Sequence, residues 1–296
     1  MIPALLLYAS LVNDVRTLVA HRDFAAAERA LRGCRTPGGA TPECAAALSW
    51  MARGELDARR LDRADAYAEE ARKTALAQLG ARRLDADPWL PMALGAAIEV
   101  HAQVLAARGE RAEAVAFLKQ QAAEFGATSL GERIRKNLNV LNLEGKPAPP
   151  LDEAVWLGPK PQPLSALRGH AVLLFFWAHW CPDCKAEAPI LASLMKTYGP
   201  KGLVLIGPTK LYGFAAQGEE APPAAEERYT LQVRQRFYPG LAEMPVPLSA
   251  ANFLAYGAST TPTLALIDRK GVVRFYHPGA VPEAELAARI QRVLGE

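Results

Sequence analysis

One stretch of the chain, residues 171–198, constrains the fold more than any other. It begins with the apolar run AVLLFFWA and ends in the amphipathic pattern PDCKAEAPILASLMKTY. A short run that is almost wholly apolar is typical of a central β-strand buried on both faces. The pattern after it predicts a helix with Pro182 in its first turn, where a missing N–H leaves no intrahelical bond unmade. The stretch therefore predicts an α/β sheet with Cys181 at a helix start and Cys184 one turn further in.

The placement of this cysteine pair has a chemical consequence. Unpaired backbone N–H groups and the helix dipole stabilise negative charge, so the pKa of the Cys181 thiol is expected to fall and its sulfur to lie exposed. The thiolate is the attacking species in disulfide exchange, which makes Cys181 the predicted nucleophile and Cys184 the resolving thiol. Half of a zinc site and two chance core residues are the alternatives.

The zinc alternative is disfavoured by the spacing of the other ligand-type residues. A structural zinc site usually has four ligands, and this half of the sequence has no second Cys or His pair at ligand spacing. Its histidines are isolated, and we therefore expect no metal. His179 precedes Cys181 by two residues; tuning of the thiol is possible in principle, but an exposed strand-end histidine is the interpretation we favour.

The first half, residues 1–144, has a different composition. Apolar residues recur there at helical spacing in three similar passages, VAHRDFAAAERALRG, DARRLDRADAYAEEARKTA and LAARGERAEAVAFLKQQ. In each, a small residue (Ala27, Ala64 or Ala112) is expected to let paired helices approach closely. The passages resemble a tetratricopeptide-type array and predict an all-α stack of helical hairpins. An irregular helical bundle is the alternative, because the intervals between these three alanines depart from the strict tetratricopeptide period.

The second half, residues 145–296, opens with a linker or extended entry marked by Pro147, Pro149 and Pro150. Short β-type runs (AVLLFFWA, GLVLIG, TLALIDR and VVRFYH) alternate there with helical stretches, which is typical of an α/β domain. The turn at Gly271 makes the last two runs an antiparallel hairpin. We therefore predict a mixed central sheet.

The net charge and the length of the apolar runs bear on whether the chain binds nucleic acid or spans a membrane. The net charge of +3 on 296 residues is too small to indicate nucleic acid. No stretch approaches the roughly 18 apolar residues that span a bilayer, so no membrane span is expected. The opening MIPALLLYASLV lacks a basic leader and is interpreted as a first helix, with any signal or anchor absent from this chain.

The segment LLFFWAHWCPDCKAEAP, with YGASTTPTLALIDRKGVV far downstream, resembles the thioredoxin-fold superfamily. Within it the chain resembles the TlpA/ResA-like thiol-disulfide oxidoreductases, from about Gly145 to Glu296. The resemblance implies disulfide exchange with protein substrates, a thioredoxin-like redox donor, and an extracytoplasmic or periplasmic location. It implies no cofactor beyond the redox-active Cys181–Cys184 disulfide.

The resemblance also implies roles for individual residues. Trp180, Cys181 and Cys184 match the active-site WCxxC motif of the family. Thr261 and Pro262 match the threonine and cis-proline that face the cysteines and present backbone to the bound substrate. An X-Pro bond is the one bond type in which the cis form is cheap enough for this use.

Three further positions shape the expected chemistry. Glu187 matches an acid that assists proton movement in ResA-like proteins; the alternative is a first-turn glutamate that stabilises a helix start. Phe175 stands where cytosolic thioredoxins carry a buried aspartate, so Glu187 is the nearby candidate proton acceptor for Cys184. Asp183 adds negative charge beside the thiolate, and we therefore hypothesise a reductant rather than a strong oxidant.

The other cysteines, Cys34 and Cys44, flank the turn-rich sequence RTPGGATPE. A disulfide there agrees with the extracytoplasmic location that the resemblance implies, and it would staple a hairpin. Two free, partly buried thiols are the alternative.

The segment 211–226 is longer than a minimal thioredoxin needs between strand and helix. A lid or substrate rim at the cysteine face is one interpretation, and a disordered surface insertion over QGEEAPPAAEE is the favoured one.

Three functions were weighed. The leading hypothesis is a thiol-disulfide oxidoreductase that acts on protein disulfides. The alternative is a scaffold in which the helical half recruits a protein partner and the thioredoxin-like half is a docking module. A thiol peroxidase is disfavoured, because the chain lacks the PxxxTxxC arrangement of that group.

Overall fold

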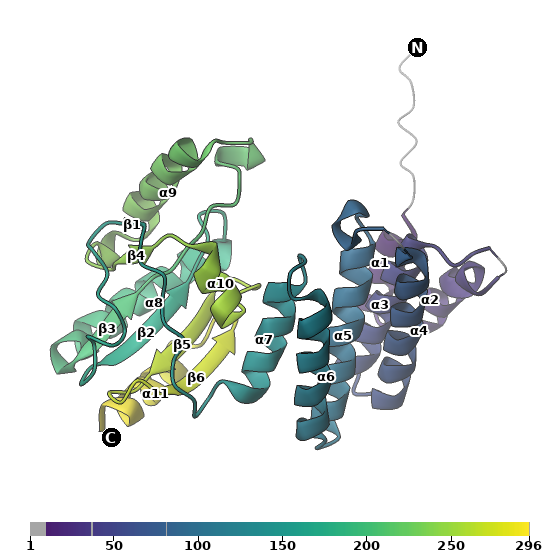
Figure 1. The fold of residues 1–296 in the computed structure, drawn as a ribbon, viewed down its shortest axis with the longest axis horizontal. Helices are drawn as coiled ribbons and strands as arrows, with labels where there is room; N and C mark the ends of the chain where they lie inside the picture. Colours follow the sequence, from purple (N-terminus) through teal and green to yellow (C-terminus); the bar gives the residue numbers. More distant parts are fainter. Residues whose placement is uncertain (1–9, 37, 81, 296) are drawn as a thin grey trace, which may run out of the picture. The chain divides into compact units, whose positions relative to one another are not determined.

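The structure is a computed structural model that describes residues 10–36, 38–80 and 82–295 (Figure 1). The chain divides into two compact units, Met1–Ile134 and Arg135–Glu296, and each is described here by itself. The first unit is helical and the second contains the sheet.

The first unit is a stack of helical hairpins, as predicted. Helix α1 packs against α2 and α3, α3 packs against α4 and α5, and α5 packs against α4 and α6. The expected first helix begins at Leu11, and residues 1–9 of the opening segment lie outside the described residues. The helices are α1 (Leu11–Ala20), α2 (Phe24–Ala30), α3 (Pro42–Asp57), α4 (Leu61–Leu79), α5 (Leu90–Ala107), α6 (Arg111–Phe125) and α7 (Gly131–Asn142), with short 3-10 turns η1 (Leu31–Arg35) and η2 (Leu84–Ala86).

The turns of the three hairpins show that one predicted packing residue was wrong. Each turn places one residue in the left-handed region just before the next helix: Arg22, Arg59 and Gly109. Ala27 and Ala64, each four residues after the N-cap of its helix, are fully buried as expected. In the third hairpin this position is Ala114, which is fully buried, whereas Ala112 is exposed. The register was displaced by two residues because the sequence AEA offers two alanines.

Helix α5 corrects the expectation about apolar length. Its 18 residues are long and apolar enough to cross a membrane, so the statement that no stretch approaches this length was wrong. More than half of that helix is buried inside the unit, between α3, α4 and α6. An apolar helix surrounded by other helices is typical of the centre of a helical domain.

The second unit is built on a four-stranded sheet of order β3-β2-β5-β6. Strand β3 runs parallel to β2, β5 runs antiparallel to β2, and β6 runs antiparallel to β5. This arrangement confirms the predicted mixed sheet. A separate pair, β1 and β4, is antiparallel. The strands are β1 (Trp156–Leu157), β2 (Ala171–Phe176), β3 (Leu203–Ile206), β4 (Val246–Pro247), β5 (Thr263–Ile267) and β6 (Val273–Pro278); the helices are α8 (Pro182–Tyr198), α9 (Pro223–Phe237), α10 (Ala250–Tyr256) and α11 (Glu283–Gly295), with 3-10 turns η3 (Gly199–Lys201), η4 (Ala216–Gly218) and η5 (Pro239–Leu241).

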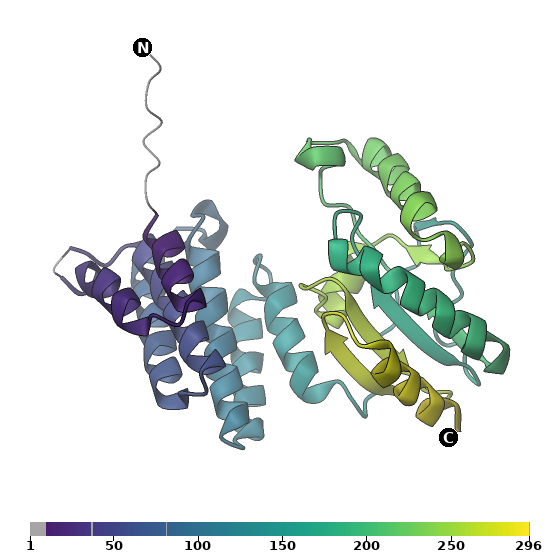
Figure 2. The ribbon, with the colours of Figure 1, turned by 180° about the vertical axis from the view of Figure 1, so that it is seen from behind.

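Strand β2 is buried on both faces because each face of the sheet is covered. Leu173 and Phe175 pack toward α8 and α11, which lie on one face of the sheet (Figure 2). The alternate residues of β2 pack toward Phe253 and Tyr256 of α10 on the other face. This period-two division explains the wholly apolar run. Helix α10 was not predicted from the sequence.

The division into units falls within α7, ten residues before the expected boundary at residue 144. Residues 135–142 of α7 belong to the sheet-containing unit. Its Asn139 side chain donates a hydrogen bond to the carbonyl oxygen of Tyr256 at the end of α10. This buried contact ties the last turns of the helix to the second unit.

Candidate active site

Cys181 is the N-cap residue of α8, and Pro182 is its first helical residue. The backbone N–H of Cys184 donates a hydrogen bond to Cys181 Sγ at 3.0 Å. The two sulfurs form a disulfide with an S–S distance of 2.17 Å. The strand-to-helix junction thus places both cysteines where the sequence analysis expected them. A sulfur that receives an amide N–H at a helix start is in a position that stabilises its anionic form.

The sulfur of Cys181 is less accessible than expected. The relative exposure of Cys181 is 1 % in the disulfide form, so the expectation of an exposed sulfur was wrong. The reason is the loop before β5, whose Thr261 carbonyl oxygen lies 3.4 Å from Cys181 Sγ. The peptide bond between Thr261 and Pro262 is cis. The structure therefore brings Thr261, 80 positions downstream, against Cys181.

Glu187 lies one helical turn after Cys184 on α8 and is buried, with 2 % exposure. Its Oε1 accepts a hydrogen bond from the backbone N–H of Val281 at 3.5 Å. Burial raises the pKa of the Glu187 carboxyl, and the single backbone bond only partly opposes this. Phe175 is fully buried in the strand beneath. Glu187 is consequently a buried acid close in sequence to the cysteines, with a raised affinity for its proton.

Trp180 of the WCPDC motif is exposed, at 46 %. Its ring packs edge-on against Tyr212, with ring centroids 5.5 Å apart. Tyr212 belongs to the long segment between β3 and α9. That segment is a hydrogen-bonded loop in which Ala221 N–H bonds to Gly213 O, so the favoured interpretation of a disordered insertion was wrong. Through Tyr212, the segment lies beside Trp180.

His179 corrects a second expectation, because it is buried at 1 % exposure instead of lying exposed at a strand end. Its Nε2 lies 3.1 Å from Oε1 of Glu226 in α9, which is also buried. Burial lowers the pKa of the His179 imidazole, although the nearby Glu226 carboxylate opposes that shift. The sequence analysis missed Glu226 altogether. The two residues are 47 positions apart, and no local pattern signals the contact.

Comparisons with known proteins agree with this geometry. Residues 165–294 match the model of the thioredoxin-like domain family. The thiol:disulfide interchange protein DsbE of Pseudomonas fluorescens biotype C is 30 % identical over 156 residues, which are 51 % of this chain and 78 % of that protein. The chain belongs to the thioredoxin-like thiol-disulfide oxidoreductases.

Other thioredoxin-like proteins also match about half of this oxidoreductase. The thioredoxin-like protein YneN of Bacillus subtilis is 29 % identical over 148 residues, which are 50 % of this chain and 78 % of YneN. The crystal structure of a thiol:disulfide interchange protein from Chlorobium tepidum TLS has a TM-score of 0.40 at 21 % identity, covering 51 % of this chain and 97 % of that one. The match to the family model begins at residue 165, so the helical unit lies outside that match.

The oxidoreductase has a second disulfide in its helical unit. The sulfurs of Cys34, in η1, and Cys44, in α3, are 2.10 Å apart. Both cysteines are buried, with exposures of 7 % and 6 %. The bridge connects the two ends of the turn-rich segment between these elements.

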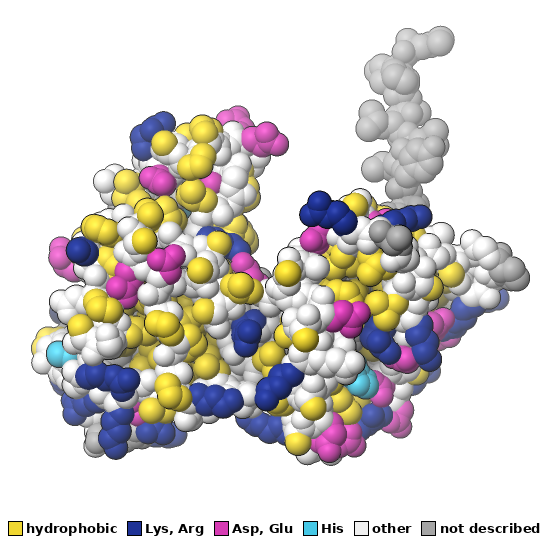
Figure 3. All heavy atoms as spheres, in the orientation of Figure 1, with side chains coloured by type: hydrophobic (Ala, Val, Ile, Leu, Met, Phe, Trp, Pro, Cys, Tyr) yellow, Lys and Arg dark blue, Asp and Glu magenta, His cyan; other side chains and the backbone are white. Residues whose placement is uncertain are grey.

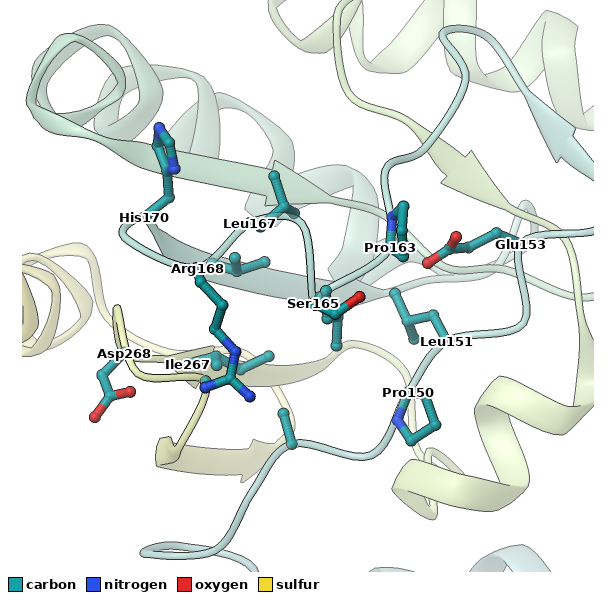
Figure 4. A pocket seen from close by; sticks show the side chains of 14 residues that line it. Pro150, Leu151, Glu153, Pro163, Ser165, Leu167, Arg168, His170, Ile267 and Asp268 are labelled. Carbon is teal, nitrogen blue, oxygen red and sulfur yellow. The ribbon is translucent and has the colours of Figure 1, made fainter.

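A cavity of about 160 Å³ lies at the other end of the sheet (Figure 4). Its lining includes His170 before β2 and Asp268 after β5, whereas the cysteines follow the opposite end of β2. Burial, together with the neighbouring Asp152 carboxylate, raises the pKa of Glu153 at its edge. None of the predicted site residues lines this cavity, so it is separate from the cysteine site.

Two features of the described residues concern ligands. Among them, no group of three or more His, Cys, Asp or Glu side chains is arranged to hold a metal ion. Over the part of the helical unit visible in Figure 3, basic and acidic side chains are interspersed. Mixed charge of this kind is typical of a solvated helix surface.

Proposed function

We propose that this protein reduces disulfide bonds in protein substrates, with Cys181 as nucleophile and Cys184 as resolving thiol. The observation that carries the proposal is the N-cap position of Cys181, whose sulfur accepts the Cys184 N–H and lies against the cis Thr261–Pro262 loop. An N–H donor at a helix start favours a thiolate. The Thr261 backbone beside the sulfur would contact a bound chain.

The reaction proceeds in two exchanges that begin from the reduced pair. The Cys181 thiolate attacks one sulfur of the substrate disulfide, which forms a mixed disulfide and releases the other substrate sulfur as a thiolate. Cys184, as its thiolate, then attacks Cys181 Sγ, which breaks the mixed disulfide and releases the second substrate thiolate. Two electrons pass from the cysteine pair to the substrate, and solvent protonates the products. A thiol donor then reduces the Cys181–Cys184 disulfide by the same chemistry.

Glu187 would accept the Cys184 proton in the second exchange. Its buried carboxyl lies one turn away, and burial raises its pKa, which suits a group that takes up and returns a proton. Trp180, Thr261 and Pro262 would contact the substrate chain. No metal or organic cofactor is required, because both electrons reside on the sulfurs.

The direction of exchange follows from the charges at the helix start. Asp183 is exposed beside Cys181 and opposes the stabilisation of its thiolate, so we expect a reductant. Equilibration with glutathione measures the potential of the pair. A value near about −120 mV, that of a strong oxidant, would contradict the assignment.

The location proposed for this protein is extracytoplasmic. The buried Cys34–Cys44 disulfide supports an oxidising compartment, because structural disulfides persist there and are rare in the cytosol. A thioredoxin-like donor would supply electrons to the cysteine pair. The stack of helical hairpins would bind a protein partner, as extended helical arrays do.

The test is reduction of insulin by dithiothreitol, compared between the wild type and Cys181→Ser. We expect the wild type to accelerate the turbidity and the variant to match dithiothreitol alone. Equal rates for the two proteins would reject the proposal and favour a scaffold. A Cys184→Ala variant should hold substrates on Cys181 as mixed disulfides, which mass spectrometry then identifies.

A further inference from the structure

The segment between β3 and α9 is fixed by one buried carboxylate, that of Glu226. Its Oε1 accepts the backbone N–H of Tyr212, and its Oε2 accepts the backbone N–H of Gly213 at 2.8 Å. His179 Nε2 adds a third contact at 3.1 Å. A carboxylate accepts hydrogen bonds only, so Nε2 carries the hydrogen and donates. A buried charge is tolerated when it is fully hydrogen-bonded in this way.

The same contacts position a group of aromatic rings beside the cysteines. We call Trp180, Tyr212 and Phe214 the aromatic wall. The rings of Tyr212 and Phe214 lie 5.7 and 5.2 Å from His179, both edge-on, and Tyr212 also packs against Trp180. Tyr229 closes the far side of His179 at 5.3 Å.

The wall adjoins the reacting sulfur through Trp180, which directly precedes Cys181 and is 46 % exposed. Tyr212 and Phe214 are half-buried, so each retains some accessible surface. Partly exposed aromatic rings beside a reactive group supply contact area for an apolar side chain. Glu226 itself is fully buried, and its carboxylate is bonded to His179 and to the backbone of Tyr212 and Gly213.

We propose that Glu226 is a positioning residue that holds the aromatic wall in place, and that this wall selects polypeptide substrates with an apolar residue next to their disulfide. The inference rests on the proposed disulfide reduction. Glu226 acts through His179 and the Tyr212–Gly213 backbone and takes no part in the exchange itself. Its loss therefore weakens binding of a polypeptide while leaving exchange with a small, wall-independent disulfide intact.

Replacement of Glu226 by glutamine is the sharpest variant. The side chain keeps its shape, but an amide has one acceptor oxygen where the carboxylate has two. Three donors converge on this site, so in either orientation the amide NH2 group faces at least one of them. A buried donor left without an acceptor is costly, and the segment is expected to leave its position.

Asp268→Asn provides a matched control in the same unit. Asp268 is a buried carboxylate that accepts the backbone N–H groups of Lys270 and Val272 and the Arg274 Nε. It follows β5 at the end of the sheet opposite the cysteines, because Ile267 pairs with Val172 at the start of β2. Phe214→Ala is a second test variant, which removes part of the wall and leaves the carboxylate in place.

The experiment measures kcat and KM for insulin reduction by the full chain with dithiothreitol, and the single-turnover rate of pre-reduced protein with hydroxyethyl disulfide. Glu226→Gln and Phe214→Ala should raise the KM for insulin about tenfold, equivalent to about 1.4 kcal/mol of lost binding. Their kcat and their rate with hydroxyethyl disulfide should change less than about twofold. Asp268→Asn should change none of these quantities.

Three results would overturn the inference. One is an equal loss on both substrates in Glu226→Gln, and another is the same loss of insulin binding in Asp268→Asn; either would indicate a general structural effect. The third is an unchanged insulin KM in Phe214→Ala. All three leave the proposed function standing if the wild type reduces insulin in a Cys181-dependent manner. An inactive wild type would reject the function and the inference together.

Discussion

One cysteine of each disulfide, Cys44 and Cys184, is the fourth residue of a similar helix start. Helix α3 starts with TPEC, in which Thr41 is the N-cap and its Oγ1 accepts the N–H of Cys44 at 3.1 Å. Helix α8 starts with CPDC, in which Cys181 is the N-cap and its Sγ accepts the N–H of Cys184 at 3.0 Å. The backbone problem and its solution are the same in both places.

The difference lies in the atom that caps the helix. The hydroxyl of Thr41 stays protonated at physiological pH, whereas a thiol at the same position can ionise and act as a nucleophile. With its cap occupied by threonine, α3 leaves Cys44 to bond with Cys34 from the preceding turn. In α8 the cap itself is the bonding partner of Cys184. The capping atom, a threonine oxygen in α3 and a cysteine sulfur in α8, thus distinguishes the structural bridge from the candidate redox pair.

The largest expected effect comes from breaking the two bridges separately and measuring insulin reduction. Cys181→Ser should reduce the rate to that of dithiothreitol alone, because a serine hydroxyl does not attack disulfides. The double variant Cys34→Ser with Cys44→Ser should keep the wild-type rate within about twofold. A comparable loss of activity in the double variant would show that the helical bridge also takes part in the chemistry.

The stability of the helical unit should respond in the opposite way: it should depend on the Cys34–Cys44 bridge and not on the Cys181–Cys184 bridge. The Cys34–Cys44 bridge spans a sequence separation of 10 and restricts the unfolded chain between η1 and α3. Loop-closure reasoning gives a loss of about 2–3 kcal/mol in the free energy of unfolding of the helical unit when both cysteines become alanine. Hydrogen exchange resolved by segment measures this loss in each unit. The pair Cys181→Ser and Cys184→Ser is the control, and protection of α3 and α4 should not change in it.

The sequence predicted those parts of the fold that depend on local pattern. The wholly apolar run fixed β2 as a central strand, and the turn at Gly271, where φ is +75°, fixed the antiparallel hairpin. Helix α10 escaped because seven residues give too little periodicity to distinguish a helix. Ala112 was chosen over Ala114 because spacing alone does not fix a helix register.

The parts that were missed depend on contacts between distant segments. His179 was expected at the surface, since the burial of a polar residue depends on its partner, and Glu226 lies in another helix. Cys181 was expected to be accessible, yet the Thr261 loop lies against it. Local pattern thus located the cysteine pair, whereas its surroundings were set by three segments that no spacing rule connects.

The acid beside the cysteines offers a test based on pH. The Glu187 carboxyl has a pKa raised above 4.5 by burial, so the folded protein holds this proton more tightly than the unfolded chain. Between 4.5 and the raised value, unfolding releases a proton, and this group's contribution to stability falls as the pH rises. Glu187→Gln does not titrate, and it should therefore gain stability relative to the wild type as the pH rises through this window. Urea unfolding of both proteins below pH 4.5 and at neutral pH measures the change. A difference that is the same at both pH values would show that the carboxyl is not desolvated.

The smallest effect concerns the shared cap itself. Thr41→Ala removes the oxygen that accepts the Cys44 N–H and should cost about 1 kcal/mol of unfolding free energy, whereas Thr41→Ser should cost a few tenths at most. Cys181→Ala and Cys181→Ser should differ by a similar amount, because both lack the disulfide and only serine retains a capping atom. Neither should reduce insulin. Equal stability of these two Cys181 variants would mean that the sulfur does not serve as a cap, and that the likeness of TPEC and CPDC ends at their sequence. A difference matching the one at Thr41 would show that α8 keeps the structural role of its N-cap while using that same atom for exchange.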